Sequence, residues 1–218
     1  MKTSNKLLIG TGICIILGII THTFIMRGAY QNALKNPMEQ EGKISLKAIN
    51  KLNLLYTNGV TFEKGSKYEI VVDEMDKDSL NIQYYGETLN LDLTKAGFIK
   101  IICPKLPIIV FDNKKSTDNS DNMVTIDSTF QYGNLKATFL KRGVLNLHKC
   151  MLDSIDIKSN INADITFDGI TVKNCNINLP AYSVLNIYYS YIQSKSVVLG
   201  DSSTFNLVGK HTHASFIK

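Results

Sequence analysis

A short alternation of apolar and polar residues returns at a fixed step in the C-terminal half of the chain. The segments that carry it are VLNL, DITF, VLNI and TFNL, which begin at Val144, Asp164, Val184 and Thr204, so that successive copies start 20 residues apart. A period of two is typical of a β-strand with one buried face, because successive side chains point to opposite sides. Each copy therefore predicts one strand whose apolar residues point inward.

Equivalent positions of the copies form columns of a single chemical type. Two columns are wholly apolar, a column between them is polar in every copy, and two more apolar columns follow further along. In chain order the members are Leu145, Ile165, Leu185 and Phe205; the polar Asn146, Thr166, Asn186 and Asn206; Leu147, Phe167, Ile187 and Leu207; Leu152, Val172 and Ile192; and Ile157, Ile177 and Val197. Such agreement predicts inward and outward positions that stack on one another.

A 20-residue repeat is too short for an independent domain and suits one coil of a β-solenoid, in which coils stack at ~4.8 Å. A leucine-rich repeat has a similar period, but its fixed asparagine and helical return are not evident. A β-sandwich is the other alternative, although one strict period favours stacking. Asn160, Pro180 and Gly200 recur at the same step and predict corners. We therefore predict an all-β parallel β-helix, or solenoid, with coils of 20 residues.

Upstream of residue 144 the step is lost, although strand-like segments persist. KYEIVVDE from Lys67, SLNIQYY from Ser79, ETLNLDL from Glu87 and FIKIICPKLPIIVFD from Phe98 predict short strands. Prolines divide the last of these, because proline cannot donate to a ladder. Residues 112–122 predict a polar surface loop, and the residues after it an irregular coil that joins the regular stack.

The N-terminal segment LLIGTGICIILGIITHTFIM, residues 7–26, has no charged side chain. A helix of about 20 such residues spans ~30 Å, which predicts a transmembrane helix with the lipid bilayer as its partner. A cleaved signal peptide is the alternative, but its apolar region is usually shorter and ends at a small-x-small site that is missing here. Ile13 stands where a lipoprotein would need a small residue before Cys14.

These observations predict three parts of the chain. Residues 1–27 are expected to form the anchor, residues 28–48 a polar linker interrupted at Asn36 and Pro37, and residues 49–218 the solenoid domain. Basic residues flank the apolar segment almost equally, so only the short N-terminal end favours a cytoplasmic N-terminus. The solenoid domain is then expected outside the cytoplasm.

The charge of the chain argues against nucleic-acid binding. The formal net charge is only +5, and the lysines are scattered along the sequence. Nucleic-acid binding requires a concentrated basic surface that displaces counterions from phosphates. We expect no nucleic-acid partner.

The cysteines and histidines give no metal or disulfide pattern. In the 20-residue register Cys150 stacks with Ile170 and Cys175 with Ile155, so the two cysteines are not aligned for a bridge, and buried free thiols are expected. No cysteine or histidine cluster has zinc spacing. His211 and His213 would share one face of a strand and could hold a metal, but they lie at the end of the sequence. We expect no metal and no cofactor.

Four aspartates raise the alternative of a β-helix carbohydrate-active enzyme, because such enzymes place acids close together. They are Asp153, Asp156, Asp164 and Asp168. In the 20-residue register they fall in four different columns, so we predict that they are solvated side chains. No catalytic residue is expected.

The segment YYSYIQ supplies the candidate binding residues Tyr188, Tyr189 and Tyr191, with Tyr182 nearby. If Tyr189 and Tyr191 share an outward face, they form an aromatic patch. Tyrosine rings give contact area at a low entropic cost, which suits protein or carbohydrate binding. Strands also favour tyrosine for purely structural reasons, so the alternative is that these residues only support the fold.

The order YEIVVDE, SLNIQY and TLNLDL, followed by a β-rich run that reaches CPKLPII, resembles the auto-transporter adhesin head domain known as the GIN domain. The resemblance covers residues 49–218 and implies a bacterial envelope protein with a right-handed β-helix. It departs from the family after Phe111, where DNKK stands in place of turns rich in glycine and serine. The family supplies no catalytic residue.

Two functions remain from the sequence. The first is a membrane-anchored, non-enzymatic solenoid that acts in adhesion, as a scaffold or in binding an envelope protein or glycan; the second is the carbohydrate-active enzyme. The expected location is the bacterial inner membrane, with the C-terminal domain in the periplasm. The alternative is a secreted or outer-membrane-associated protein after signal cleavage.

Overall fold

The computed structural model describes residues 21–23, 27, 41–57, 59–93, 97–112 and 122–210. The chain divides into two compact units, Met1–Gln40 and Glu41–Lys218. In the first unit, residues 21–23 and 27 are helical. The rest of the expected membrane span, 7–26, lies outside the described residues, and none of the helices that are described is long and apolar enough to cross a membrane.

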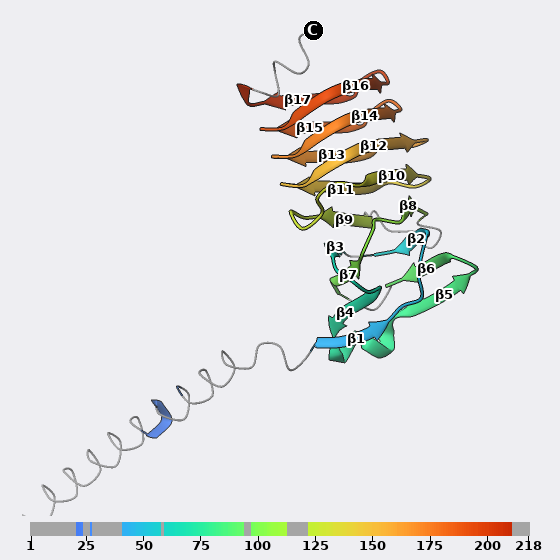
Figure 1. The fold of residues 1–218 in the computed structure, drawn as a ribbon, viewed down its shortest axis with the longest axis vertical. Coiled ribbons are helices and arrows are strands. Elements are labelled where there is room, and N and C mark those ends of the chain that lie inside the picture. The colour runs from blue at the N-terminus through green and yellow to red at the C-terminus, as the bar shows by residue number, and fades with distance from the viewer. Residues whose placement is uncertain are drawn as a thin grey trace, which may run out of the picture. The chain divides into compact units, whose positions relative to one another are not determined.

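The second unit consists of two β-sheets, which we call sheet A and sheet B (Figure 1). Both are largely parallel, as the predicted solenoid requires. In spatial order sheet A contains β1 (Glu41–Ser45), β4 (Glu69–Asp73), β7 (Ile99–Cys103), β3 (Val60–Lys64), β9 (Asn122–Ile126), β11 (Gly143–His148), β13 (Ala163–Asp168), β15 (Val184–Tyr188) and β17 (Thr204–Val208). Sheet B contains β16 (Tyr191–Leu199), β14 (Thr171–Leu179), β12 (Met151–Ser159), β10 (Asn134–Phe139), β8 (Ile108–Phe111), β2 (Lys51–Tyr56), β6 (Thr88–Asp92) and β5 (Asn81–Tyr85).

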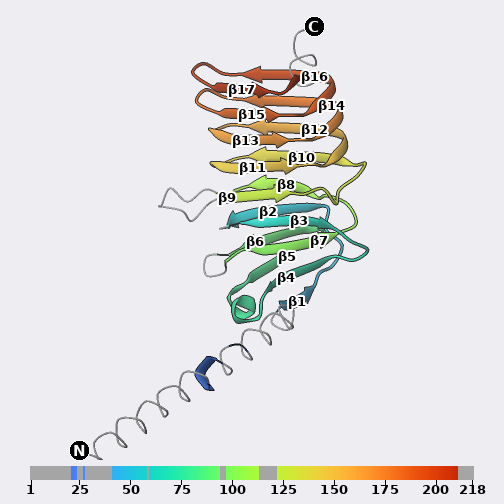
Figure 2. The same ribbon diagram turned by 90° about the vertical axis from the view of Figure 1, so that its left-hand side faces the viewer.

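The C-terminal half is the regular stack that the sequence predicts. Strands alternate between the sheets, so that each coil contributes one strand to sheet A and one to sheet B, and the coils lie one above the next (Figure 2). Leu145 is in register with Ile165, Ile165 with Leu185, and Leu185 with Phe205, which confirms the 20-residue step. The other predicted columns are in register as well.

The interior between the sheets is filled mainly by buried apolar side chains. Leu145, Ile165 and Leu185 are fully buried, whereas the polar column beside them, with Asn146 and Thr166, is only half-buried. Phe205 is 40% exposed because it lies on β17, the last described strand of sheet A. All the described core residues belong to Glu41–Lys218, so this unit has the core that independent folding requires.

Corners join the sheets where they are expected. Asn160, Pro180 and Gly200 each follow the last residue of a sheet B strand. Backbone bonds link successive corners: the Asn160 N–H donates to the Phe139 carbonyl, and the Gly200 N–H donates to the Leu179 carbonyl. The prediction of corner residues at these positions is confirmed.

The N-terminal half departs from a purely parallel solenoid. β1 pairs with β4, β4 with β7, and β5 with β6 in antiparallel orientation. β5 and β6 form a hairpin, in which Gly86 adopts a φ of 63° that a tight turn needs and glycine adopts freely. A 3₁₀ helix, η1 (Glu74–Ser79), connects two of the predicted strands and includes the end residue expected for each, Glu74 and Ser79. β1 also lies within residues 28–48, so part of the expected linker is a strand.

The irregular half still supplies coils to the same stack. β2 pairs in parallel with both β6 and β8, and β3 pairs in parallel with both β7 and β9. β8 and β9 then pair with β10 and β11, the first strands of the regular part. The expected polar loop, 112–122, lies outside the described residues except for its two ends, Asp112 and Asn122, and Asn122 is the first residue of β9.

Candidate functional site

The connections that lead from a sheet A strand to the following sheet B strand have a repeated geometry. In three successive coils the connection is only two residues, 149–150, 169–170 and 189–190, and we call this line of connections the short-turn edge. In each connection the first residue is exposed and the second is buried, as Lys149 and Cys150 illustrate. The same two-residue corner therefore recurs in these three coils.

The first residue of each short turn has a left-handed backbone. The φ angles are 50° at Lys149, 64° at Gly169 and 49° at Tyr189, and Gly209 continues the series at 110°. Glycine adopts such angles without a steric penalty, whereas an L side chain strains the backbone. The turns are held by bonds to the next coil, for example from the Tyr189 N–H to the Val208 carbonyl at 2.8 Å. Tyr189 thus occupies a position that its own conformational preference disfavours.

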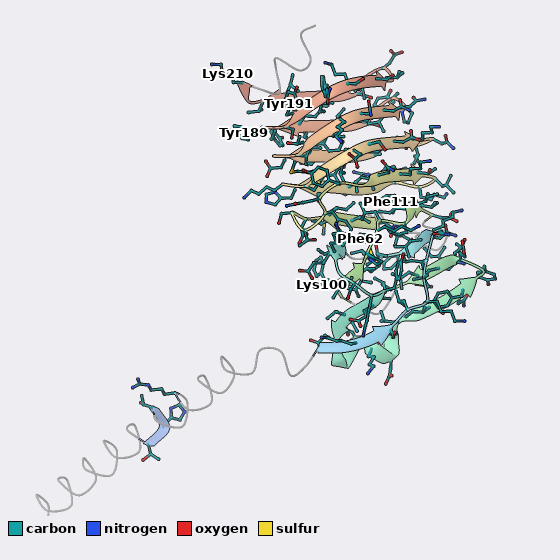
Figure 3. All side chains as sticks on the ribbon, viewed as in Figure 1. Phe62, Lys100, Phe111, Tyr189, Tyr191 and Lys210 are labelled. Atoms are coloured by element: carbon teal, nitrogen blue, oxygen red, sulfur yellow. The ribbon has the colours of Figure 1, made fainter. Side chains whose placement is uncertain are left out.

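This turn places Tyr189 and Tyr191 on the same edge (Figure 3). Tyr189 is 70% exposed, and Tyr191, the first residue of β16, is 50% exposed. Tyr188, the last residue of β15, is half-buried and in register with Asp168 and Val208. All three candidate tyrosines therefore come together, with Tyr189 and Tyr191 the more accessible.

Glycines flank Tyr189 in its column. Gly169 in the coil on one side and Gly209 on the other carry no side chain that could cover the ring. A Cβ atom at Gly209 would lie only 3.0 Å from the Tyr189 Cα and Cδ1 atoms, so the close approach of the two turns requires glycine there. The short-turn edge therefore leaves the Tyr189 ring prominent.

Tyr182 lies elsewhere. It precedes β15, whereas Tyr189 follows it, and that strand has five residues. At ~3.3 Å per strand residue the two backbones are more than 15 Å apart, at opposite ends of the sheet A strands. Tyr182 is 67% exposed but does not join the aromatic patch.

Tyr132, which is not among the predicted site residues, lies at the same end of the strands as the short-turn edge, in a longer connection nearer the irregular half. It belongs to the connection between β9 and β10, is 65% exposed and has a φ of 60°. Its neighbour Gln131 forms a parallel bridge with Met151, which is in register with Thr171 and, through it, with Tyr191. Only this register shows that the two aromatic positions share one edge.

The four aspartates do not converge, as the sequence predicts. Each is bonded to a different partner in a neighbouring coil or strand. The Lys173 Nζ is 2.7 Å from Asp153, the Asn176 Nδ2 donates to Asp156 at 3.0 Å, the Arg142 guanidinium is 3.6 Å from Asp164, and the His148 Nδ1 is 2.9 Å from Asp168. The hydrogen bond from Lys173 to Asp153, with the charge of Asp153, raises the pKa of that lysine. These carboxylates form ladder pairs and not a paired acid and base.

The cysteines within the described residues are free and buried, as predicted. Burial raises the pKa of the Cys103, Cys150 and Cys175 thiols from 9.0 to about 12. They are therefore protonated and unreactive at neutral pH. Cys14, His211 and His213 lie outside the described residues, and among the residues that are described no group of three or more His, Cys, Asp or Glu side chains could hold a metal ion.

No family model and no curated protein matches the chain. Among solved structures it is similar to a candidate adhesin from Parabacteroides distasonis, with 13% sequence identity, a TM-score of 0.56, and coverage of 77% of this chain and 72% of that one. A candidate adhesin from Bacteroides fragilis gives 15% identity, a TM-score of 0.36, and coverage of 76% and 95%. A candidate lipid-binding protein from Parabacteroides distasonis gives 11% identity, a TM-score of 0.33, and coverage of 79% of this chain and 98% of that one. At 13% identity, the first likeness establishes a shared fold and nothing further.

Proposed function

We propose that the chain is a non-enzymatic binding module of the cell envelope, whose short-turn edge adheres to an envelope protein or glycan. The observation that carries the proposal is the pair Tyr189 and Tyr191, 70% and 50% exposed on one edge of a stacked β framework. Exposed tyrosines on a rigid support bury large areas on binding and lose little side-chain entropy. Their position is fixed by the register of the coils, so the patch is organised before any partner binds.

The arrangement of the acids supports a non-enzymatic role. Hydrolysis of a glycosidic bond needs two carboxyl groups on either side of one reacting atom. Asp153 and Asp168 are instead engaged with Lys173 and His148, which belong to separate ladders. Acids held in separate ladders are not placed on either side of one atom, as that reaction requires.

The envelope location rests on the sequence. In this proposal residues 7–26 anchor the chain in the bacterial inner membrane and the solenoid faces the periplasm. The resemblance to the GIN domain family supports an envelope protein, and the fold shared with a candidate adhesin from Parabacteroides distasonis agrees with an adhesive role. We also propose that the coils wind in the right-handed sense, as the resemblance implies.

The test is binding of the Glu41–Lys218 unit to cell envelopes isolated from the source bacterium. We expect the unit to sediment with the envelopes, and the double variant Tyr189→Ala/Tyr191→Ala to bind at least tenfold more weakly, which corresponds to a loss of about 1.4 kcal/mol. Tyr182→Ala is the matched control, because it removes an equally exposed tyrosine from the opposite edge. Equal sedimentation of the three proteins would contradict the proposal.

Protease treatment and periodate oxidation of the envelopes then separate the two kinds of partner, since each destroys one of them. The enzymatic alternative has its own readout. Release of reducing ends from a polysaccharide panel by the unit, lost in Asp153→Asn or Asp168→Asn, would show that the chain is an enzyme after all.

A further inference from the structure

A pocket of ≈ 430 Å³ opens on the same edge as the tyrosines, where the irregular half meets the regular stack. Its position follows from the length of two connections. The strand-to-strand turns of the regular coils have two residues there, but β7 and β8 are joined by 104–107, and β9 and β10 by 127–133. These longer connections cannot close on each other as the short turns do, and the pocket lies between them.

Three lysines line the pocket, and no acidic residue does. Lys64 is the last residue of β3, Lys105 lies in the connection after β7, and Lys136 is on β10, so three separate elements bring the charges together. All three are exposed. The Lys64 Nζ donates to the Gln131 carbonyl at 3.3 Å, which holds that ammonium group at the rim.

Two carboxylates close to the pocket accept hydrogen bonds from amide side chains. Asp156, the register partner of Lys136, accepts a hydrogen bond from the Asn176 side chain at 3.0 Å. Glu87 accepts one from the Asn50 side chain. Within the part of the chain that the structure describes, no ion pair involves Lys64, Lys105 or Lys136. The ammonium groups of the three lysines are therefore not held in ion pairs with the described carboxylates.

The remaining lining suits a ring with an apolar face. Tyr132 stands 65% exposed at the wall, and its N–H donates to the Met151 carbonyl at 2.8 Å, which fixes the backbone of the turn. Phe130 is buried beneath, and Asn134 offers an amide beside Lys136. Lys173 lies 6.0 Å from the Tyr132 ring centroid but is already paired with Asp153. An aromatic wall, an amide and three lysines form the mixed apolar and polar lining of a small-ligand site.

A peptide strand fits this place poorly. Recognition by strand addition needs an unpaired sheet edge. β8 is paired with both β2 and β10, and β10 with both β8 and β12, so neither strand at the pocket offers a free edge. A pyranose ring, in contrast, can lay its C–H face on tyrosine, take hydrogen bonds from an amide and place a carboxylate between lysines, where charge-assisted bonds are strong.

We propose that this pocket binds a carboxylate-bearing sugar residue, such as a uronic acid unit of an envelope glycan. Lys105 and Lys136 bind the carboxylate, and the sugar ring lies against the Tyr132 side chain. The site does not include Tyr189 or Tyr191, so the test of this proposal is independent of the test of the aromatic patch.

The test is a calorimetric titration of the full-length chain with four probes: tetramers of galacturonate and of glucuronate, neutral galactotetraose and hexaglutamate. We expect at least one uronate tetramer to bind, and more tightly than galactotetraose and hexaglutamate. Lys105→Ala/Lys136→Ala and Tyr132→Ala are each expected to weaken binding at least tenfold. Lys105→Arg/Lys136→Arg keeps the charge and is expected to retain binding. An unchanged thermal midpoint identifies variants that remain folded.

The matched control is Lys43→Ala/Lys210→Ala, which removes the same charge from exposed lysines outside the pocket. Equal losses in the control and in Lys105→Ala/Lys136→Ala would show a general charge effect and overturn the proposal. It is overturned as well if neither uronate binds, if galactotetraose binds equally well, or if hexaglutamate binds at least as tightly, which would favour an acidic peptide.

Discussion

The rings of Phe111 and Phe139 stack face to face, with their centroids 4.1 Å apart and their planes 6° from parallel. Phe111 ends β8 and Phe139 ends β10, so this pair joins the irregular half of the solenoid to the regular half. Both side chains are fully buried. Because neither ring can move without disturbing the other, the space around the pair is fixed.

Gly143 lies against this pair and is expected to tolerate no larger residue. A Cβ atom there would come within 2.6 Å of the Phe111 ring and 3.2 Å of the Asn122 carbonyl oxygen. Gly143→Ala should therefore lower the free energy of unfolding by about 1–3 kcal/mol, the usual cost of overpacking a core. Gly133→Ala is the control, since no atom lies within 4 Å of its Cβ position. Urea unfolding of the Glu41–Lys218 unit measures both; equal midpoints would contradict the packing described at Gly143.

The register predicts opposite effects for a charge at two adjacent positions. Ile165 is fully buried between Leu145 and Leu185, whereas Thr166 is half-buried and accepts a hydrogen bond from the Asn186 side chain at 3.4 Å. A carboxylate at 165 would be buried without a partner, a cost of several kcal/mol. Ile165→Asp should abolish cooperative unfolding of the Glu41–Lys218 unit, and Thr166→Asp should leave its thermal midpoint almost unchanged. Similar midpoints for the two variants would refute the register.

The buried thiols predict a pH dependence of stability. Cys103, Cys150 and Cys175 have folded pKa values of about 12, above the ordinary 9.0. Between these values the unfolded chain binds fewer protons at the three thiols than the folded chain does. Their contribution is therefore fully present below pH 9 and is lost as the pH rises toward 12. Cys175→Val should weaken this loss, and urea midpoints measured from pH 8 to 11 test it. An identical pH dependence in the variant would contradict the assignment.

The same thiols are expected to resist modification. In the Glu41–Lys218 unit at pH 8, a disulfide reagent that releases a coloured thiol should react only after the unit is unfolded, because the thiolate is the reactive form and the reagent cannot reach it. Rapid reaction of the folded unit would show that the interior is open.

The regular coils could be predicted because each one makes the same contacts as its neighbours. Any residue in the Leu145 column meets an equivalent residue 20 positions away, so the constraint is repeated in the sequence and becomes visible. The irregular half has no such constant step. Asn53 bonds to Asn90 across 37 residues and Thr57 to Asn122 across 65 residues, and these separations leave no period. The antiparallel hairpin had one local signal, Gly86 between two strand-like segments.

The candidate site could be predicted only in part. The sequence placed Tyr188, Tyr189 and Tyr191 together, but the left-handed turn column is concealed because Lys149 and Tyr189 share it with glycines. Tyr132 lies beside Gln131, and Gln131 is related to Tyr191 only through three successive strand pairings. The pocket depends on the lengths of two connections in the half without a period, so its lysines gave no pattern along the chain.

The central claim is that the short-turn edge is the surface in contact with the partner, and site-specific photo-cross-linking in living cells of the source organism tests it most directly. A benzophenone amino acid replaces Tyr189 in one full-length chain and Tyr182 in another, two positions that are 70% and 67% exposed on opposite edges. We predict that irradiation converts the chain labelled at 189 into a discrete species of higher mass and leaves the chain labelled at 182 unchanged. Equal products from both positions, a product from 182 alone, or none from 189 would contradict the claim.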